Sequence, residues 1–398
     1  MTIYRVLTTK KMKNFNFDTA TRILFGKGKT DEIIPEIIRS GSRVLLAYGG
    51  GSIKKTGLYN QVVNLLNNDR IYFVELNGIQ PNPRMKSVRE GVRLCRENKL
   101  DFILAVGGGS VLDCAKAIAA GVFYDGDAWD FMIKKASVEE ALPIGTILTL
   151  AATGSEMNGN AVISNEETSE KRAMSSALLR PVFSVLDPEL TFSVNRWHTA
   201  AGVTDIMSHI FELYFTPDTG TLVQDALSES LLRICIECGP VAVEEPENYV
   251  ARANLLWAGT LALNGLLGAG KSAGDWATHA IEHELSAIYD LTHGAGLAIV
   301  FPAWMEYVLN PENSWRFAKL ARNVWGIEVT DDMAAARQGI DAAREFFSSI
   351  GMPVSLKEVN IDDSQLTEMG KKACVFGPVG LMKELTAEDV TAILRKAL

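Results

Sequence analysis

All five histidines of the 398-residue chain lie in one stretch, between residues 198 and 293. Asp205 and His209 are four residues apart in a segment with helical periodicity, so their side chains share one helix face. His279 and His283 have the same spacing in a second segment, and His293 follows a short non-helical stretch. One carboxylate and three imidazoles can complete an oxygen and nitrogen site for a divalent metal such as Fe²⁺ or Zn²⁺.

Each pair alone is weak evidence, because an Asp and a His one turn apart are often joined only by a hydrogen bond. Two such pairs and a fifth histidine in one half of the chain together favour a metal site. Five histidines are more than one site needs, so at least one of them has another role.

A glycine-rich turn follows the apolar segment Phe102–Val106, and a helical segment begins after it. The turn reads Gly107-Gly108-Gly109-Ser110. A helix N-terminus offers free N–H groups, and glycines let a diphosphate approach the backbone. Asp113 lies one turn further and would repel phosphates, so we expect it to cap the helix or to contact a sugar or amide. A tight turn without any ligand is the simpler alternative.

A second turn, Gly49-Gly50-Gly51-Ser52, follows the apolar segment Arg43–Tyr48. NAD sites commonly place an acidic residue near the adenosine ribose at such a strand end. Here the neighbouring charged residues are Lys54 and Lys55, which suit the 2′-phosphate of NADP. An ordinary basic surface turn is the alternative.

Short apolar segments alternate with helical ones up to about residue 188, which predicts a parallel sheet covered on both sides. After Asp187-Pro188 the periodicity is mostly helical. We therefore expect an α/β domain over residues 1–188 and an all-α domain over residues 189–398. The expected strands are Arg43–Tyr48, Ile71–Leu76, Phe102–Val106, Ile144–Leu150 and Val182–Leu186, and the expected long helices are Thr199–Phe215, Gln224–Cys238, Ala251–Gly268 and Asp331–Ile350.

The first eleven residues resemble neither domain and are either an alternative start or an ordered extension. The next segment, Asn14–Leu24, alternates like a strand and ends near a glycine turn.

Composition excludes several classes of protein. The chain has 39 basic and 48 acidic residues, a net charge of −9, which leaves no basic footprint for nucleic acid or an anionic membrane. The longest uncharged stretch, residues 253–270, carries four glycines and is expected to be a buried helix pair rather than a membrane span. Five scattered cysteines fit the cytoplasm, and Cys235 and Cys238 are expected in a helix core rather than in a redox site.

Four motifs, read in order, resemble the iron-containing (group III) alcohol dehydrogenases. They are GGGSVLDCAKAIA at 107–119, TLAATGSEMNGNAVIS at 149–164, GVTDIMSH at 202–209 and HAIEHELSAIYDLTH at 279–293. The segments at 48–57, 246–265 and 275–285 are similar to the butanol dehydrogenase and NADPH aldehyde reductase branch. The resemblance runs from about residue 12 to the C-terminus and implies a dehydroquinate synthase-like architecture, with the metal in the cleft between two domains.

The resemblance also implies roles for single residues. Asp205, His209, His279 and His293 match the metal ligands, with Fe²⁺ or Zn²⁺ both possible, and His283 matches a histidine beside the nicotinamide. It assigns NADP(H) to the following positions: Gly49, Gly50, Ser52, Asn82, Gly108, Gly109, Ser110, Asp113, Thr149, Thr153, Ser155, Asn158, Lys171 and Leu186.

The implied reaction is hydride transfer between NADP(H) and short- to medium-chain aldehydes or primary alcohols. The metal would act as a Lewis acid, and His283 would relay a proton. The resemblance further implies a homodimer paired through the N-terminal strand.

Two other functions, a lyase and a non-catalytic scaffold, are the alternatives to this reaction. A lyase of the dehydroquinate synthase type needs Arg and Lys near the histidines, where this chain instead has the apolar or aromatic residues Ile206, Phe211, Trp257, Leu261, Trp276 and Tyr289. A non-catalytic scaffold would not need four intact ligand positions.

Overall fold

The computed structural model describes residues 12–398, which form two compact units. The sheet unit contains Thr19–Asn195 and Glu245–Thr260. The helical unit contains residues 12–18, Arg196–Glu244 and Leu261–Leu398. The sequence places a single boundary at residue 188, whereas the sheet unit continues beyond it and takes in a later segment.

Contacts of that later segment explain why it belongs to the sheet unit. The ring of Trp257 packs edge-on against Phe25, with 6.1 Å between the ring centroids. The Thr260 hydroxyl donates to the buried carboxylate of Glu156 at 2.5 Å. Neither interaction has a signal in the sequence, because both join residues far apart along the chain.

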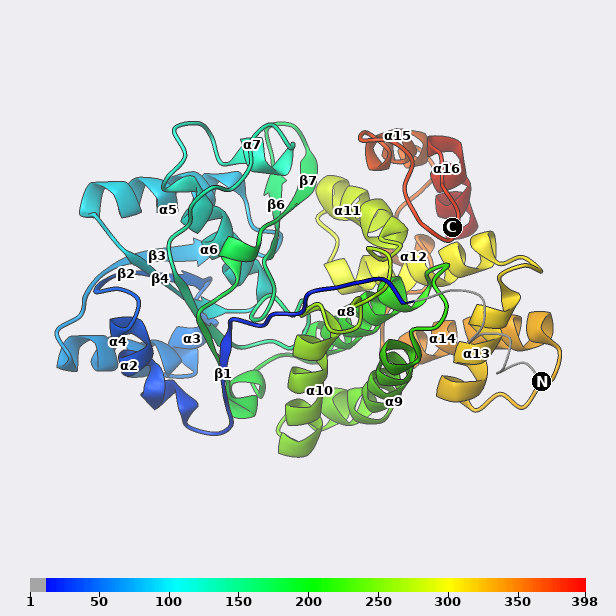
Figure 1. Ribbon diagram of the computed structural model, residues 1–398, viewed down its shortest axis with the longest axis horizontal. Coiled ribbons are helices and arrows are strands. Elements are labelled where there is room, and N and C mark those ends of the chain that lie inside the picture. Colours follow the sequence, from blue (N-terminus) through cyan, green and yellow to red (C-terminus); the bar gives the residue numbers. More distant parts are fainter. Residues whose placement is uncertain (1–11) are drawn as a thin grey trace. The chain divides into compact units, whose positions relative to one another are not determined.

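The core of the sheet unit is a six-stranded, all-parallel sheet in the order β1-β8-β5-β4-β2-β3 (Figure 1). The sequence predicts five of these strands to within a few residues. The strands are β1 (Arg22–Phe25), β2 (Arg43–Gly49), β3 (Tyr72–Ile79), β4 (Phe102–Gly107), β5 (Ile144–Leu148) and β8 (Phe183–Leu186).

Helices cover both faces of this sheet, as the continuous apolar strands predict. In β2, Val44 and Leu46 face one layer, and Leu45 and Ala47 face the other. The first layer consists of α2 (Ile33–Ile38), α3 (Ser52–Lys55) and α4 (Leu58–Asn68), and the second of α5 (Met85–Asn98), α6 (Gly109–Gly121) and the short α7 (Trp129–Met132) (Figure 1).

The strand order reverses at β2, which pairs with β3 on one side and with β4 on the other. In open parallel sheets, ligands bind outside the carboxyl ends of the strands at such a reversal. The turns that follow β2 and β4 are the two glycine-rich turns, so the fold places both of them at this edge.

A hairpin that the sequence analysis did not identify lies outside the main sheet. Its strands, β6 (Asn160–Asn165) and β7 (Glu170–Ser175), pair antiparallel. The hairpin follows directly from residues 149–159, which connect it to β5.

The expected strand at Asn14–Leu24 is wrong over most of its length. Only Arg22–Phe25 forms a strand, β1, and residues 12–21 have no regular secondary structure. Phe15 and Phe17 are exposed, so this alternation of side chains does not correspond to a half-buried strand. The expectations for residues 1–11 lie outside the described residues.

The helical unit is built around α8 (Arg196–Tyr214), which is buried from Thr199 to its end. The helix expected over Ala251–Gly268 ends earlier, at Ala262, where a glycine-containing turn follows. The other helices are α9 (Leu222–Glu244), α10 (Tyr249–Ala262, mostly in the sheet unit), α11 (Ala277–Tyr289), α12 (His293–Val308), α13 (Ser314–Trp325), α14 (Asp332–Ser349), α15 (Leu366–Ala373) and α16 (Ala387–Lys396).

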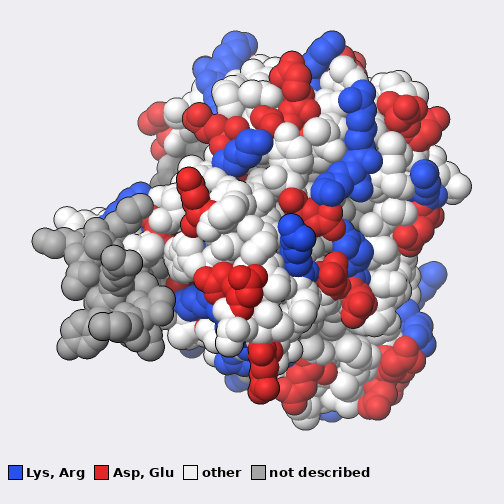
Figure 2. Space-filling model, turned by 90° about the vertical axis from the view of Figure 1, so that its right-hand side faces the viewer, with Lys and Arg blue, Asp and Glu red and all other residues white. Residues whose placement is uncertain are grey.

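Basic and acidic side chains are intermixed over the face seen in Figure 2. Within residues 12–398, no helix is both long enough and apolar enough to cross a bilayer.

Candidate metal centre and cofactor loops

Asp205 and His209 lie on one face of α8, as their spacing predicts. The Nε2 atom of His209 is 3.6 Å from Oδ1 of Asp205, and both side chains are buried. Burial lowers the pKa of His209 to about 3, so its ring is neutral and can donate a lone pair to a metal.

His279 approaches the same carboxylate from α11. Its Nε2 atom lies 4.0 Å from Oδ1 of Asp205, and its ring stacks on that of His209 at a centroid distance of 4.9 Å. Its Nδ1 atom is 2.9 Å from Oε1 of Glu212. This bond fixes the tautomer that leaves Nε2 free for a ligand role.

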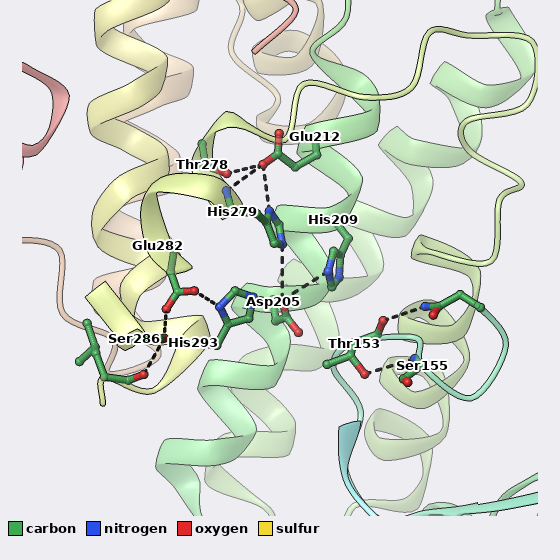
Figure 3. A network of polar contacts seen from close by, with 12 residues as sticks. Thr153, Ser155, Asp205, His209, Glu212, Thr278, His279, Glu282, Ser286 and His293 are labelled. Atoms are coloured by element: carbon green, nitrogen blue, oxygen red, sulfur yellow. Dashed lines mark hydrogen bonds and ion pairs between the residues drawn. The ribbon is translucent and has the colours of Figure 1, made fainter. Parts of the chain in front are cut away.

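His293 is the first residue of α12 and completes the group. Its Nε2 atom is 3.6 Å from Oδ1 of Asp205. Its Nδ1 atom makes a short contact with Oε2 of Glu282, and the other oxygen of that carboxylate accepts from Ser286. Figure 3 shows the three rings converging on Asp205, with Glu212 and Glu282 behind two of them.

The donor set fits a divalent metal. Two atoms that each lie about 2.1 Å from a shared ion are at most about 4.2 Å apart, which accommodates the three nitrogen–oxygen distances. Ligand atoms of Asp205, His279 and His293 all lie within 4.8 Å of one another. Oδ1 of Asp205 and Nε2 of His279 are buried without a hydrogen-bond partner in the described part of the chain. Such orphaned atoms are what a metal ion would satisfy.

Neither Glu212 nor Glu282 is indicated as a site residue by the sequence. Each comes three residues after a candidate ligand, namely His209 and His279, but contacts a histidine on a different helix. The sequence spacing therefore links each glutamate to the wrong histidine.

Glu212 also caps α11. The first turn of this helix has no side-chain cap of its own. The carboxylate of Glu212 instead accepts from the backbone N–H of Trp276 at 2.6 Å and from the Thr278 hydroxyl at 2.5 Å. One buried anion thus fixes both the helix end and the ring of His279.

His283 lies beside the candidate ligands. Its ring centroid is 6.5 Å from that of His279 and 5.7 Å from that of His293. A second possible ligand group contains Glu282, His283 and His293, but both oxygens of Glu282 already accept hydrogen bonds. We therefore retain Asp205, His279 and His293 as the candidate centre, and add His209 because its Nε2 atom lies 3.6 Å from the same carboxylate.

Among the apolar residues expected near the histidines, Trp276 contacts them directly. Its ring lies 5.3 Å from that of His279, and its backbone adopts a left-handed conformation with φ 60°. A bulky side chain rarely adopts this conformation, which is typical of functional sites. Phe211 instead packs in the core against Phe301, and Trp257 belongs to the sheet unit.

In the sheet unit, Gly49 ends β2 and Ser52 begins α3. Between them, Gly51 has φ 113°, and a Cβ atom added to Gly50 would meet no atom within 4 Å. The turn is therefore open at Gly50. The Lys54 ammonium lies over the ring of Tyr59, 4.7 Å from its centroid.

The carboxylate of Glu75 in β3 lies near this turn and accepts hydrogen bonds from two tyrosines. The Tyr59 hydroxyl donates at 2.8 Å, and Tyr48 donates through a shorter contact. Each oxygen of this carboxylate therefore already accepts a hydrogen bond from a tyrosine.

Gly108 is the N-cap of α6, and Gly109 and Ser110 are its first residues. A Cβ atom on Gly109 would lie 2.4 Å from Oγ1 of Thr153, so only glycine fits there. Thr149 follows β5, and its N–H donates to Gly107 at 3.0 Å. The structure thus brings these expected cofactor residues to the same edge of the sheet.

The remaining expected cofactor residues are mostly engaged within the protein. Asn82 follows β3 with φ 49°, Leu186 ends β8, and Lys171 is buried in β7. Three more, Asp113, Ser155 and Asn158, hydrogen-bond within a cluster around the buried Lys116.

Cys235 and Cys238 lie in α9 without a disulfide. Burial raises the pKa of both thiols, most strongly for the fully buried Cys235. Cys235 thus lies in the core as expected, whereas Cys238 is partly exposed, and the expected core position is wrong for it.

Two family models match the chain. Residues 20–188 match "Iron-containing alcohol dehydrogenase", and residues 199–398 match "Fe-containing alcohol dehydrogenase family, C-terminal".

Individual proteins are similar over nearly the whole chain. NADH-dependent butanol dehydrogenase A of Clostridium acetobutylicum is 50% identical, over 97% of this chain and 100% of its own length. NADPH-dependent aldehyde reductase YqhD of Escherichia coli is 44% identical, over 91% of this chain and 93% of its own. The crystal structure of NADH-dependent butanol dehydrogenase A from Thermotoga maritima has a TM-score of 0.94 at 42% identity, covering 97% of this chain and 99% of that one.

Proposed function

Because the chain belongs to the iron-containing alcohol dehydrogenase family, we propose that it transfers a hydride between NADP(H) and short- to medium-chain aldehydes or primary alcohols. The observation that carries this proposal is the convergence of His209, His279 and His293 on Asp205. Relatives named for butanol and for aldehyde reduction support the substrate class.

We assign the metal to Asp205, His209, His279 and His293. When bound, Fe²⁺ or Zn²⁺ supplies Lewis-acid polarisation of the substrate oxygen, and the nicotinamide supplies the hydride. The donor set of one oxygen and three nitrogens suits either ion. The family description supports iron.

The residues of the chain keep this centre ready to bind the metal. Glu212 and Glu282 hold the Nδ1 sides of two rings, so that Nε2 of each is directed to the Asp205 carboxylate. His283, one helical turn after His279, can pass a proton to or from the substrate oxygen. Trp276 supplies an apolar surface beside the rings, which suits an alkyl chain.

The metal assignment is tested with His279→Ala. This variant should lose metal and turnover of butanal together while its circular dichroism spectrum stays that of the wild type. Normal turnover in this variant would contradict the ligand assignment. A wild-type preparation that contains no metal and does not reduce butanal with NADPH would favour the non-catalytic alternative.

We further propose NADP(H) as the preferred cofactor. A Cβ atom at Gly50 would meet no protein atom within 4 Å, so a phosphate can approach the turn there, and Ser52 at the start of α3 can donate to it. Relatives are named for both cofactors, so the preference of this chain depends on its own residues. A charge-assisted hydrogen bond contributes about 1.5–3 kcal/mol, a preference of about 10- to 150-fold.

Gly50→Asp tests this preference, because a Cβ atom added at Gly50 meets no protein atom within 4 Å and the residue needs no left-handed backbone. The variant should repel the 2′-phosphate and shift the ratio of kcat/KM for NADPH and NADH toward NADH. Gly50→Asn is the matched control, since it has the same size without the charge. A wild-type ratio below one, or a ratio that Gly50→Asp leaves unchanged, would refute the proposal.

We also propose a homodimer. β1 is an edge strand that pairs with β8 alone in this sheet, so its other edge has no strand partner among the described residues and could pair with a second copy. Sedimentation should show a dimer at micromolar concentration, and a monomer would contradict the proposal. The cytoplasmic location remains a prediction from the cysteine pattern.

A further inference from the structure

Lys116 of α6 is a fully buried lysine, and every proton of its ammonium group has an acceptor. It donates to Oγ of Ser155 at 2.7 Å, to Oδ1 of Asn158 at 3.1 Å and to the backbone carbonyl of Asn160 at 2.9 Å. All three acceptors lie between the end of β5 and the start of β6. We call residues 149–159 the cofactor loop, because Thr149, Thr153, Ser155 and Asn158 were all expected to line the cofactor.

Asp113 binds the same segment one turn earlier in α6. Its Oδ1 atom accepts from the Ser155 hydroxyl at 2.6 Å, and its Oδ2 atom accepts from the Val162 N–H at 2.9 Å. The Ser155 hydroxyl therefore connects Lys116 to Asp113. Because these two residues are three apart on the helix, they share one face.

The side-chain amide of Asn158 is also engaged within the loop. It donates to the carbonyl oxygens of Gly154 at 2.8 Å and Thr153 at 3.3 Å, and its Oδ1 atom accepts from Lys116 and from the N–H of Asn160. Asp113, Ser155 and Asn158 thus hold the loop with side chains of residues that the sequence assigns to the cofactor site.

The first turn of α6 contacts the same loop. Gly109 packs so closely on Thr153 that a Cβ atom would lie 2.4 Å from its hydroxyl. A shift of the loop would therefore change the position of Thr153 relative to the diphosphate turn. The ammonium of Lys116 holds the loop against the helix with two bonds, to Ser155 and to Asn158, in addition to these contacts.

We propose that Lys116 is a positioning residue for the nicotinamide cofactor, fastening the cofactor loop to the helix that carries the diphosphate turn. This inference rests on the proposed function, since it requires that a cofactor binds there. Replacing a whole buried cluster of charges by well-packed apolar residues is often neutral or stabilising, so a buried ammonium that is kept with three directed bonds points to a geometric requirement.

The environment of the ammonium makes its charge sensitive to pH. The pKa of Lys116 is lowered to about 8, mainly because the group is buried. The negative charges of Asp113 and Glu156 oppose this shift, and the positive charge of Arg180 adds to it. Above this pH the amine is neutral and donates two hydrogen bonds instead of three. Cofactor binding by the wild type should weaken as the pH rises from 7 to 9.5.

Lys116→Met tests the proposal. The primary measurement is the Kd of NADPH, from its fluorescence on binding to metal-free protein, so that no turnover is needed. We expect the Kd to rise about tenfold, equivalent to 1.4 kcal/mol. In the metal-loaded enzyme, the KM for NADPH should rise while the KM for butanal stays unchanged. The pH dependence of the Kd should disappear.

A control variant and the wild-type protein keep the test decisive. Lys86→Met makes the same change at an exposed position on the neighbouring helix α5 and should leave the Kd unchanged. If Lys116→Met fails to fold, the wild-type protein still tests the proposal, because a Kd of NADPH that stays constant between pH 7 and 9.5 would contradict it. A folded Lys116→Met protein with the wild-type Kd, or with the wild-type pH dependence, would overturn the proposal. Wild-type protein that binds no NADPH at all would instead refute the proposed function.

Discussion

Replacing Glu212 with Gln should weaken metal binding without removing a ligand. The carboxylate is fully buried and faces four donors: the N–H groups of Trp276 and His279, the Thr278 hydroxyl and Nδ1 of His279. A glutamine keeps one acceptor oxygen, and its amide N–H₂ group opposes at least one of these donors. The ring of His279 then loses the anion that fixes its orientation.

The size of the effect follows from that one contact. A hydrogen bond to a charged group contributes about 1.5–3 kcal/mol, which corresponds to about 10- to 150-fold in affinity. Losing a partner of this kind behind a ligand typically costs about 10- to 100-fold in metal affinity. We expect the metal Kd of Glu212→Gln to rise about 10- to 100-fold.

The assay is competition with a chromogenic chelator at pH 7, together with the melting temperature of the metal-free protein. Glu229→Gln is the matched control, because this buried carboxylate accepts from the Tyr214 hydroxyl and the Asn323 amide but from no histidine. It should lose stability and keep the wild-type metal Kd. A Glu212→Gln protein that folds normally and binds metal within twofold of the wild type would refute the reasoning, as would equal losses of affinity in both variants.

Three further outcomes are expected. His283→Ala should retain stoichiometric metal but turn over more slowly, and loss of metal would make it a ligand. Burial alone would raise the pKa of Asp225, but Arg316 and its other cationic partners lower it to about 2. The stability that this carboxylate contributes is therefore complete above about pH 4 and is lost as the pH falls toward 2. The difference in unfolding free energy between wild type and Asp225→Asn should shrink by about 2 kcal/mol over that range, which denaturant titration at each pH measures. A thiol reagent at pH 8 should modify Cys238 much faster than Cys235, followed by peptide mass spectrometry, and equal rates would contradict the burial of Cys235.

The parts of the site that the sequence predicts are those fixed by local geometry. The spacing of Asp205 and His209 places both on one helix face whatever the rest of the chain does. The apolar segments at Arg43–Gly49 and Phe102–Gly107 predict buried parallel strands, and the glycines that follow them mark the turns. These inferences need only the period of a helix or a strand.

The parts that the sequence does not predict depend on contacts between distant segments. Glu282 follows His279 by one turn but holds His293, and no spacing rule indicates this pairing. The sequence indicates only that Lys116 lies in a helix. Its three acceptors are distant in sequence and surround the ammonium only when the loop is folded against α6. The alternation around Phe15 predicted a strand, yet this segment has no strand partner among the described residues.

The sheet unit is discontinuous along the chain, and this has a consequence for folding during synthesis. A nascent chain that has reached Asn195 contains all six strands of the sheet but lacks Glu245–Thr260. In that chain the buried carboxylate of Glu156 has no Thr260 hydroxyl, and Phe25 is not covered by Trp257. Domains that are contiguous can fold as soon as they leave the ribosome. Here the first unit to be translated can be completed only after α8 and α9 have also emerged, so Asp205 and His209 are synthesised before the sheet unit has its last segment.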